Sequence, residues 1–374
     1  MNKVALITYH AAYNFGSALQ ALATQNVIRD ISGDCTIINY RMLSQKKFYS
    51  NIRTGLGFKT FLKDFLRLPA WKQLNIRATR FENFQENYFN LSSCFTTPEE
   101  IYRYWNEFDT IVSGSDQIWN KHSCELENVS FNYMFPYLLK DYCGKKISYA
   151  SSIGNMTDAD LETIHLYIDE FSSISMRESS SAARLSKLLN REIPTVLDPT
   201  LLLSGNEWKE TLKINDYSNE PYILYYSLSY YKEINKWIPA LERLAKNHNM
   251  KVKIITPFVY LKLNKDIFER HYDYGPVEFV DALNNAAFVL TDSYHGTLFS
   301  LNLHKKFGSI CLQGGSEFRK TDILKRLEMN NNIIDNPKTL DDYYNLNINY
   351  SKVEDKLSDL REKSKQYLLK SINA

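Results

Sequence analysis

The sequence predicts two α/β domains, each built on a doubly wound sheet of parallel strands. Its 374 residues are more than one hydrophobic core usually supports. Strand-like and helix-like apolar patterns alternate along the chain. Between the two halves, 204–221 (SGNEWKETLKINDYSNEP) has the polar, Gly- and Pro-containing composition of a linker. We therefore expect one Rossmann-like domain over 1–204 and a second over 220–345, facing a central cleft.

The first domain opens with a predicted strand, helix and strand. Residues 4–9 (VALITY) form a short apolar run, the apolar residues of 18–31 recur at helical spacing, and 35–40 (CTIINY) form a second apolar run. This order predicts a parallel sheet, because parallel strands need a crossover connection. Further strands are predicted at 109–114, 145–154, 172–178 and 194–203.

The alternation starts afresh beyond the linker. Strands are predicted at 222–228, 251–256, 287–293 and 305–312, with helices at 232–248, 276–286 and 296–303 between them. The charged amphipathic stretch 350–374 predicts a last helix, which could pack back on the first domain.

The net charge of +2 gives no global field for nucleic acid, so no nucleic-acid partner is expected. The segment 46–80 is a local exception. It holds nine Lys and Arg residues and one acid, Asp64, with Phe, Leu and Trp interleaved. Such a composition is typical of an amphipathic surface segment. Two interpretations stay open: a solvated helix face that packs on the first domain, or a patch that contacts an anionic membrane or a lipid-linked diphosphate.

The start of the sequence, MNKVALITYH, lacks the features of a signal peptide, and no window approaches the roughly 20 apolar residues of a membrane helix. We expect a cytoplasmic protein, peripheral at the inner face of the membrane if 46–80 binds there. The cysteines are odd in number, scattered and never spaced as CxxC, so neither a disulfide framework nor a metal site is expected. They are Cys35, Cys94, Cys124, Cys143 and Cys311.

Ligands bind at the carboxyl ends of strands in open α/β sheets, so the loops after predicted strands are the candidate site. In the first loop, Asn14, Gly16 and Ser17 precede a helix whose N-terminus could bind an anion. An N-cap and a tight turn would explain the same residues. His10 ends the first strand and would point into the same cleft.

The second loop, SGSDQIW, combines small residues, an acid and an amide with an indole. That combination is a plausible rim for a sugar or a phosphate, although Asp116 could instead cap the following helix. The residues are Ser113, Gly114, Ser115, Asp116, Gln117 and Trp119.

The third loop places Arg177 and Glu178 at a strand end. A guanidinium there can bind a carboxylate or phosphate through two parallel hydrogen bonds. The alternative is a local ion pair with Glu178 or another acid.

The fourth loop is TDSYHGTLFS. Asp292 and Ser293 end a buried strand, His295 follows, and Gly296 and Thr297 begin a helix. Histidine titrates near neutral pH and can move a proton, and a helix N-terminus tends to keep it neutral. A packing role is the alternative.

Taken in order, these loops resemble motifs of the polysaccharide pyruvyl transferase family. The matching stretches are NFGSALQ, SGSDQIW, SYASSIG, SMRES, LDPTLLL and TDSYHGTLFSL, within about residues 4–310. The resemblance implies a fold similar to that of the GT-B glycosyltransferases. It also implies transfer of a pyruvyl group from phosphoenolpyruvate to two hydroxyls of a sugar or lipid-linked oligosaccharide, giving a ketal in surface or capsular polysaccharide biosynthesis. No metal or cofactor is implied.

The same resemblance implies roles for individual residues. His295 is the leading general acid or base, Arg177 holds the donor's carboxylate or phosphate, and Asp116 orients or deprotonates the acceptor hydroxyl. The acceptor side would be lined by Asn14, Gly16 and Ser17, and the donor side by Ser293 and Thr297.

One position departs from the family pattern. Members whose pyruvyl transfer is best established carry an arginine two residues before the histidine, where this chain has Ser293. The nearest cations that could replace it are Arg319 and Lys320. Two other functions stay open: a glycosyltransferase of the same fold with a nucleotide-sugar donor, and a noncatalytic glycan-binding or scaffold protein. No GxGxxG motif opens either domain, which disfavours the former.

Overall fold

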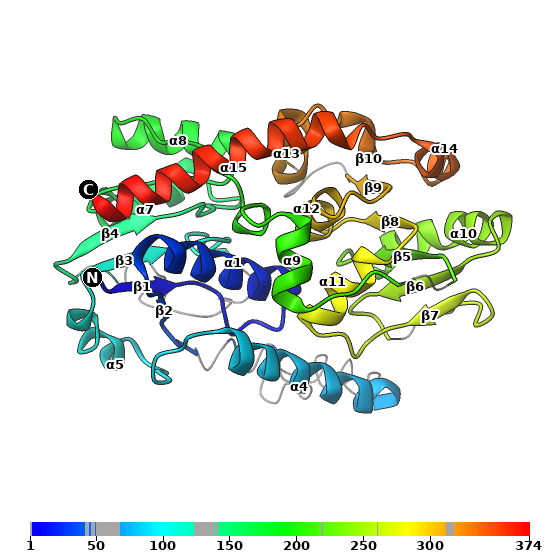
Figure 1. The fold of residues 1–374 in the computed structure, drawn as a ribbon, viewed down its shortest axis with the longest axis horizontal. Helices are drawn as coiled ribbons and strands as arrows, with labels where there is room; N and C mark the ends of the chain where they lie inside the picture. Colours follow the sequence, from blue (N-terminus) through cyan, green and yellow to red (C-terminus); the bar gives the residue numbers. More distant parts are fainter. Residues whose placement is uncertain are drawn as a thin grey trace. The chain divides into compact units, whose positions relative to one another are not determined.

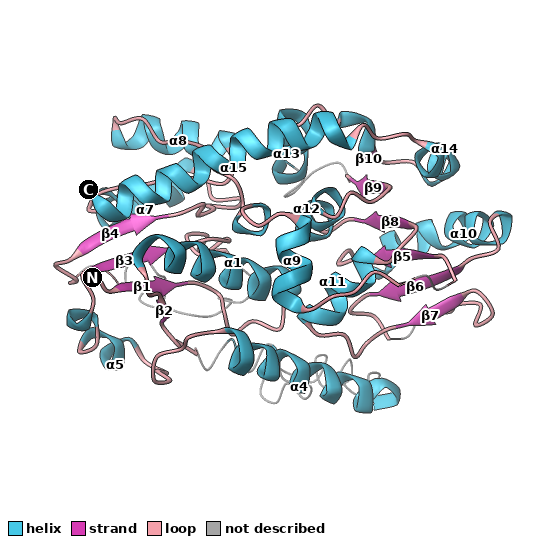
Figure 2. Cartoon of the chain, viewed as in Figure 1, coloured by secondary structure: helices cyan, strands magenta, loops and turns pink. Residues whose placement is uncertain are grey.

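The chain forms two compact units in a computed structural model (Figure 1). Unit 1 comprises Met1–Ser50, Gln85–Leu202 and Leu357–Ala374, and unit 2 comprises Asn51–Phe84 and Leu203–Lys356. The structure describes residues 2–41, 45, 49, 68–122, 139, 141–217, 220–259, 261–311 and 318–374. Each unit holds a parallel sheet with helices between its strands, so the predicted α/β class is confirmed (Figure 2).

The sheet of unit 1 has the strand order β2-β1-β3-β4, and all its pairs are parallel. Both β1 and β3 are buried along their whole length, as expected for a parallel sheet covered on both faces. The predicted strand, helix and strand at the start of the chain are confirmed. The elements are β1 (Val4–Ile7), α1 (Phe15–Ser32), β2 (Thr36–Ile37), β3 (Thr110–Ser113) and β4 (Lys145–Ser148).

Three strand predictions in unit 1 are wrong in part. β4 ends at Ser148 because the chain turns at Ala150 and Gly154, which have φ of 49° and 56°. Residues 172–178 form only isolated bridges to their neighbours. Within 194–203, Pro199–Leu201 is a 3-10 helix, η5, which Asp198 caps by accepting from the Thr200 N–H.

Unit 1 has further α-helices among its described residues. They are α5 (Pro98–Tyr102), α7 (Asp158–Asp169), α8 (Ser179–Leu189) and the part of α15 (Tyr350–Asn373) from Leu357 onward. That part of α15 is bound to the first unit by hydrogen bonds. For example, Tyr367 Oη donates to the Ser148 carbonyl at 3.0 Å, and Arg361 Nε donates to the Leu201 carbonyl at 2.8 Å.

Unit 2 has a parallel six-stranded sheet in the order β10-β9-β8-β5-β6-β7. Its predicted strands and helices are present, and β7 and β10 are short strands that the sequence pattern did not indicate. The strands are β5 (Tyr222–Tyr226), β6 (Lys251–Ile255), β7 (Phe268–Arg270), β8 (Phe288–Thr291), β9 (Phe307–Ile310) and β10 (Ile333–Ile334). The described α-helices between Leu203 and Asn345 are α9 (Gly205–Leu212), α10 (Tyr231–Asn247), α11 (Pro276–Asn284), α12 (Tyr294–Asn302), α13 (Phe318–Arg326) and α14 (Leu340–Asn345).

For two segments, the structure differs from the prediction: one has a different secondary structure and the other belongs to a different unit. The expected linker contains α9, because Ser204 and Glu207 form a capping box and Trp208 and Leu212 are buried one turn apart. The predicted first domain, 1–204, includes the basic segment 46–80. The described residues of this segment from 68 onward, which enter α4 (Trp71–Tyr88), belong to unit 2, and most of the remainder lies outside the described residues.

Among the described helices, none combines the length and apolar character that crossing a membrane requires.

Candidate functional site

Asp116 lies three residues after β3, at the carboxyl end of the sheet of unit 1. Its φ of 71° is in the left-handed region, which Asp tolerates better than most residues. Ser17 Oγ in α1 donates to its Oδ2 at 2.9 Å, and the Gln117 N–H donates to its Oδ1 at 2.8 Å. Asp116 therefore joins the loops that follow β1 and β3, which the sequence placed in the same site.

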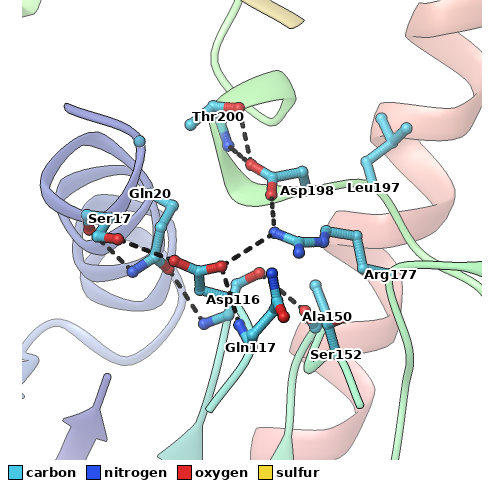
Figure 3. A network of polar contacts seen from close by, with 12 residues as sticks. Ser17, Gln20, Asp116, Gln117, Ala150, Ser152, Arg177, Leu197, Asp198 and Thr200 are labelled. Atoms are coloured by element: carbon cyan, nitrogen blue, oxygen red, sulfur yellow. Dashed lines mark hydrogen bonds and ion pairs between the residues drawn. The ribbon is translucent and has the colours of Figure 1, made fainter. Parts of the chain in front are cut away.

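Arg177 faces Asp116 within a buried ion-pair network (Figure 3). Its Nη1 lies 3.6 Å from Asp116 Oδ1 and 2.9 Å from Asp198 Oδ2, and its Nε donates to Glu178 Oε1 at 2.9 Å. The side chains of Arg177, Glu178 and Asp198 are at most 1% exposed, whereas that of Asp116 is 13% exposed. These contacts favour the interpretation of Arg177 as a local ion-pair partner.

The small residues around Asp116 allow close backbone packing and make buried hydrogen bonds within the loop. Gly114 has a φ of 137°, and a Cβ there would lie 2.0 Å from the Tyr149 carbonyl oxygen, so the position requires glycine. Ser115 is fully buried and its Oγ donates to the Ala150 carbonyl at 2.8 Å. Ser113 is buried as well, and its Oγ accepts from Trp119 Nε1 at 3.3 Å.

Trp119 was expected on the rim of a ligand site, but the structure places it in the core of unit 1. It is fully buried, and its ring packs edge-on against Phe171 at 5.3 Å between centroids. Gln117 is half-buried and its Oε1 accepts from Asn120 Nδ2 at 2.8 Å. Asp116 is the one acid among the six residues selected from this loop, and its side chain is 13% exposed at the sheet edge.

The loop after β1 forms a helix cap. Asn14 is the N-cap of α1, and its Oδ1 accepts from the N–H groups of Gly16 at 2.9 Å and Ser17 at 3.4 Å. Gln20, the last residue of the NFGSALQ motif, links the same loops. Its Nε2 donates to Thr8 Oγ1 at 2.8 Å, and its Oε1 accepts from the Ser115 N–H at 3.1 Å.

His10 is fully buried beside the same loop. Its Nε2 lies 3.0 Å from Asn39 Oδ1, which also accepts from Arg41 Nε at 3.0 Å, and its Nδ1 lies 3.3 Å from the Thr8 carbonyl oxygen. Because an arginine can only donate, Asn39 presents its oxygen to both Arg41 and His10. His10 therefore ties the ends of β1 and β2 together.

In unit 2 the histidine loop begins α12 at the carboxyl end of β8. Ser293 is the N-cap, and its Oγ accepts from the Gly296 N–H at 3.3 Å. Thr297 Oγ1 donates to the Ser293 carbonyl at 3.0 Å. His295 occupies the second position of the helix, is 8% exposed, and lies beside the Tyr294 ring at 5.2 Å between centroids.

Gly296 allows α12 to pack closely against the sheet of unit 2. A Cβ there would lie 2.5 Å from Thr291 Oγ1 and 2.9 Å from Tyr226 Cδ1. Burial raises the pKa of the Tyr226 hydroxyl well above its ordinary value, and a hydrogen bond with Ser293 opposes the shift. Tyr226 is therefore a neutral phenol near neutral pH, in contact with the cap of α12.

Asp292 connects the loops that follow β8 and β5. Its Oδ1 accepts from the Leu228 N–H at 2.8 Å, its Oδ2 accepts from the Ser229 N–H at 3.2 Å, and Ser227 Oγ donates to Oδ2. The carboxylate holds two neighbouring loops of one sheet edge in place.

The two candidate replacement cations have different surroundings. Lys320 is 2% exposed, and its Nζ donates to the carbonyls of Asp292, at 2.7 Å, and Ile310. The Arg319 guanidinium lies over the Tyr294 ring, 5.4 Å from its centroid. Arg319 is therefore beside the residue that precedes His295, whereas Lys320 binds the ends of β8 and β9.

In the part of the chain that the structure describes, no three His, Cys, Asp or Glu side chains are grouped so that they could hold a metal ion. The site residues divide into one set at the carboxyl edge of the unit 1 sheet, around Asp116, and a second at the corresponding edge of the unit 2 sheet, around His295. Asp198 and Thr200 belong to the first set and lie in the LDPTLLL motif, so the motif could have indicated them.

Solved structures with a similar fold cover nearly the whole chain. The UDP-GlcNAc 2-epimerase from Methanocaldococcus jannaschii matches with a TM-score of 0.55 and 13% identity over 93% of each chain. Arabidopsis thaliana UGT89C1, complexed with quercetin, matches with a TM-score of 0.53 and 11% identity over 97% of this chain and 94% of that one. These likenesses, with the two parallel sheets, define a two-domain α/β protein of the GT-B fold class.

The family follows from the sequence itself. The model of the polysaccharide pyruvyl transferase family matches residues 14–310, which is most of the chain. The chain therefore belongs to the polysaccharide pyruvyl transferase family, as its motifs suggested. No curated protein matches the chain.

Proposed function

We propose that this protein transfers the pyruvyl group of phosphoenolpyruvate to two hydroxyls of one sugar, in the biosynthesis of a surface or capsular polysaccharide. The family match over residues 14–310 is the observation that carries the proposal. Two features support it: a carboxylate with fixed partners at one sheet edge, and a histidine at a helix start at the other. The proposal requires no cofactor.

The reaction needs an acid, a base and a group that binds the donor's negative charge. A proton adds to the methylene carbon of phosphoenolpyruvate, which becomes a methyl group and leaves positive charge on C2. One sugar hydroxyl bonds to C2 and loses its proton. The bond from C2 to the phosphate oxygen breaks, its electron pair leaves with phosphate, and a second hydroxyl bonds to C2 and loses its proton. The two sugar hydroxyls lose two protons in total. One of them replaces the proton that was added to the methyl group, and the other leaves with phosphate.

We assign proton transfer to the donor's methylene carbon to His295 in unit 2, and removal of the acceptor's hydroxyl proton to Asp116 in unit 1. The N-cap loop of α1 would line the acceptor side, and Ser293 and Thr297 the donor side. Arg177 was expected to bind the donor anion, but its side chain is buried among carboxylates. We therefore assign that role to Arg319, which lies beside Tyr294.

The test is turnover with defined donors and acceptors. Purified protein is incubated with phosphoenolpyruvate and lipid-linked or nucleotide-linked galactose, mannose, glucose and N-acetyl sugars. We expect phosphate release together with a product whose mass increases by one pyruvyl ketal. Transfer of the sugar from a UDP-sugar, with phosphoenolpyruvate left unchanged, would instead establish a glycosyltransferase. Sugar binding with no turnover of either donor would indicate a glycan-binding protein.

A lipid-linked acceptor would place the enzyme in the cytoplasm at the inner face of the membrane. We propose that the basic segment 46–80, most of which lies outside the described residues, makes this contact. Flotation with anionic liposomes should show binding at low salt that is lost at high salt, because surface charge attraction is screened. Absence of binding at either salt concentration would remove the membrane contact.

A further inference from the structure

Asp198 is a buried carboxylate that has no role in the proposed reaction. Its side chain is 0% exposed and both of its oxygens are engaged (Figure 3). Oδ2 accepts from Arg177 Nη1 at 2.9 Å, and Oδ1 accepts from Thr200 N–H at 3.0 Å and Thr200 Oγ1 at 2.7 Å. Burying a carboxylate is costly unless it is paired and hydrogen-bonded, so this geometry fixes the carboxylate in one orientation.

Asp198 and Glu178 hold the guanidinium of Arg177 at two different nitrogens. Glu178 Oε1 accepts from Nε at 2.9 Å, and Asp198 binds Nη1. The same Nη1 lies 3.6 Å from Asp116 Oδ1. Asp198 is thus the closer partner of this nitrogen, and it limits how tightly Arg177 can pair with Asp116.

The turn that carries Asp198 is itself held by the C-terminal helix. Ser364 Oγ of α15 accepts from the Leu197 N–H at 3.0 Å. Arg361 Nε of the same helix donates to the Leu201 carbonyl at 2.8 Å. The helix therefore fixes the backbone on both sides of the Asp198 turn.

We propose that Asp198 is a positioning residue: it holds Arg177 at a fixed distance from Asp116, and α15 holds Asp198. A carboxylate that pairs more tightly with a guanidinium is a weaker base, so this arrangement keeps Asp116 able to accept a proton. The inference rests on the proposed function only in the role given to Asp116.

Asp198→Asn tests the kinetic consequence. The variant keeps the size of the side chain but removes the charge that competes for Arg177 Nη1. We expect kcat to fall about 10-fold, the most that a base weakened by about 1 pKa unit would lose, with KM for donor and acceptor within about threefold of wild type. Thr200→Val, which removes one donor to Asp198, should lower kcat about fivefold. A rise in KM with kcat unchanged would overturn the proposal.

Asp158→Asn is the matched control. Asp158 also pairs with an arginine of unit 1, Arg184, whose Nη2 lies 2.7 Å away, but its side chain is 90% exposed. Its neutralisation should leave kcat unchanged. Circular dichroism and thermal melting of each variant show whether it is folded. If Asp198→Asn does not fold, Ser364→Ala tests the hold of α15 on the Asp198 turn, because it removes the acceptor of the Leu197 N–H; kcat should fall and KM should stay unchanged.

A titration that needs no turnover separates this inference from the proposed function. With ¹³C-labelled aspartate, the carboxyl signal of Asp116 is assigned through Asp116→Asn and followed against pH. The titrating or charged groups of the described network around Asp116 are Arg177, Glu178 and Asp198, with Ser17 and the Gln117 N–H as its neutral donors.

In Asp198→Asn we expect the Asp116 midpoint to move to lower pH by about 1 unit, because a like charge is lost and Arg177 is freed to pair with Asp116. An unchanged midpoint would refute the positioning role, whatever the enzyme's donor proves to be. If the midpoint moves but phosphoenolpyruvate is not used by the wild-type protein, the proposed function fails and the positioning role stands.

Discussion

At the scale of single residues, the Asp116 carboxylate is defined by its partners. Ser17 Oγ and the Gln117 N–H donate hydrogen bonds to its two oxygens, and Arg177 Nη1 lies at ion-pair distance, 3.6 Å away. The partly exposed carboxylate is therefore oriented by the protein before a ligand binds, which is a property of catalytic groups in preorganised sites.

His295→Ala tests the acid or base assigned to unit 2. Turnover should fall about 10²- to 10⁴-fold, the usual contribution of a positioned proton-transfer group. His165→Ala on α7 is the control, because His165 is a partly exposed histidine outside both sets of site residues. Full activity in a folded His295→Ala variant would show that His295 is a packing residue.

Arg319→Gln tests the donor-binding cation. Loss of a charge-assisted hydrogen bond should raise KM for phosphoenolpyruvate about 10-fold or more, with a smaller effect on KM for the acceptor. Arg326→Gln is matched to it, since Arg326 is at the opposite end of α13 and pairs there with Asp322 at 3.9 Å. An unchanged KM for phosphoenolpyruvate in Arg319→Gln would exclude Arg319 from donor binding.

The sequence indicated candidate residues on separate loops but not their surroundings. Asp116, Ser17 and Arg177 were selected from separate loops, and the structure brings them together. Trp119 was misplaced because an indole after a small-residue loop looks the same whether it lines a rim or packs in a core. The neighbouring Glu178 was one of the partners offered for Arg177, whereas Asp198 could not be paired with it, because Asp198 lies 21 residues away in the chain.

At the scale of elements, the short α12 depends on close packing. If Gly296 carried a Cβ, this atom would contact Thr291 in β8 and Tyr226 in β5, which are adjacent strands. A side chain at this position would therefore move the first turn of α12, and His295 with it.

Gly296→Ala should consequently lower the free energy of unfolding by about 1–3 kcal/mol, the usual effect of overpacking. Urea denaturation measures it. Gly308→Ala in β9 of the same unit is the comparison, because the nearest atom to its Cβ would be 3.2 Å away, against 2.5 Å at Gly296. Equal stability of Gly296→Ala and wild type would contradict the packing argument.

Element predictions succeeded where apolar runs were long and bounded by turn residues. The strands β1, β3, β5, β6, β8 and β9 follow such runs. The failures have local causes: Pro199 and the capping Asp198 form a 3-10 helix within an apolar run, and β7 and β10 are only three and two residues long. Strands of that length carry too little periodicity to be distinguished from loops.

At the scale of the whole molecule, each unit combines distant parts of the chain. Unit 1 takes three segments, including Leu357–Ala374, and unit 2 takes two. A prediction of two consecutive domains cannot describe units that are made of several separate segments. Long-range packing brings these segments together, and the local sequence pattern does not show it. Unit 1 is thus completed only when the C-terminal helix is present.

Thiol labelling can report whether unit 1 opens as a whole. Cys35 is fully buried, and burial raises the pKa of its thiol well above the ordinary value, so it should resist alkylation in the native protein. Cys94 and Cys143 are exposed and should react. Mass spectrometry of the peptides should show Cys35 labelled only under unfolding conditions. Labelling of Cys35 as fast as Cys94 in native buffer would contradict this account of the core.

The central claim is that the pyruvyl group of phosphoenolpyruvate is transferred to two hydroxyls of one sugar and forms a ketal there. The most direct measurement is NMR and mass spectrometry of the product formed from [2-¹³C]phosphoenolpyruvate in deuterated water. We predict that the label appears in a carbon bonded to two oxygens of the same sugar, beside a methyl group that carries one deuterium from solvent. Label that stays in phosphoenolpyruvate, or that is recovered only as free pyruvate, with every acceptor would contradict the claim.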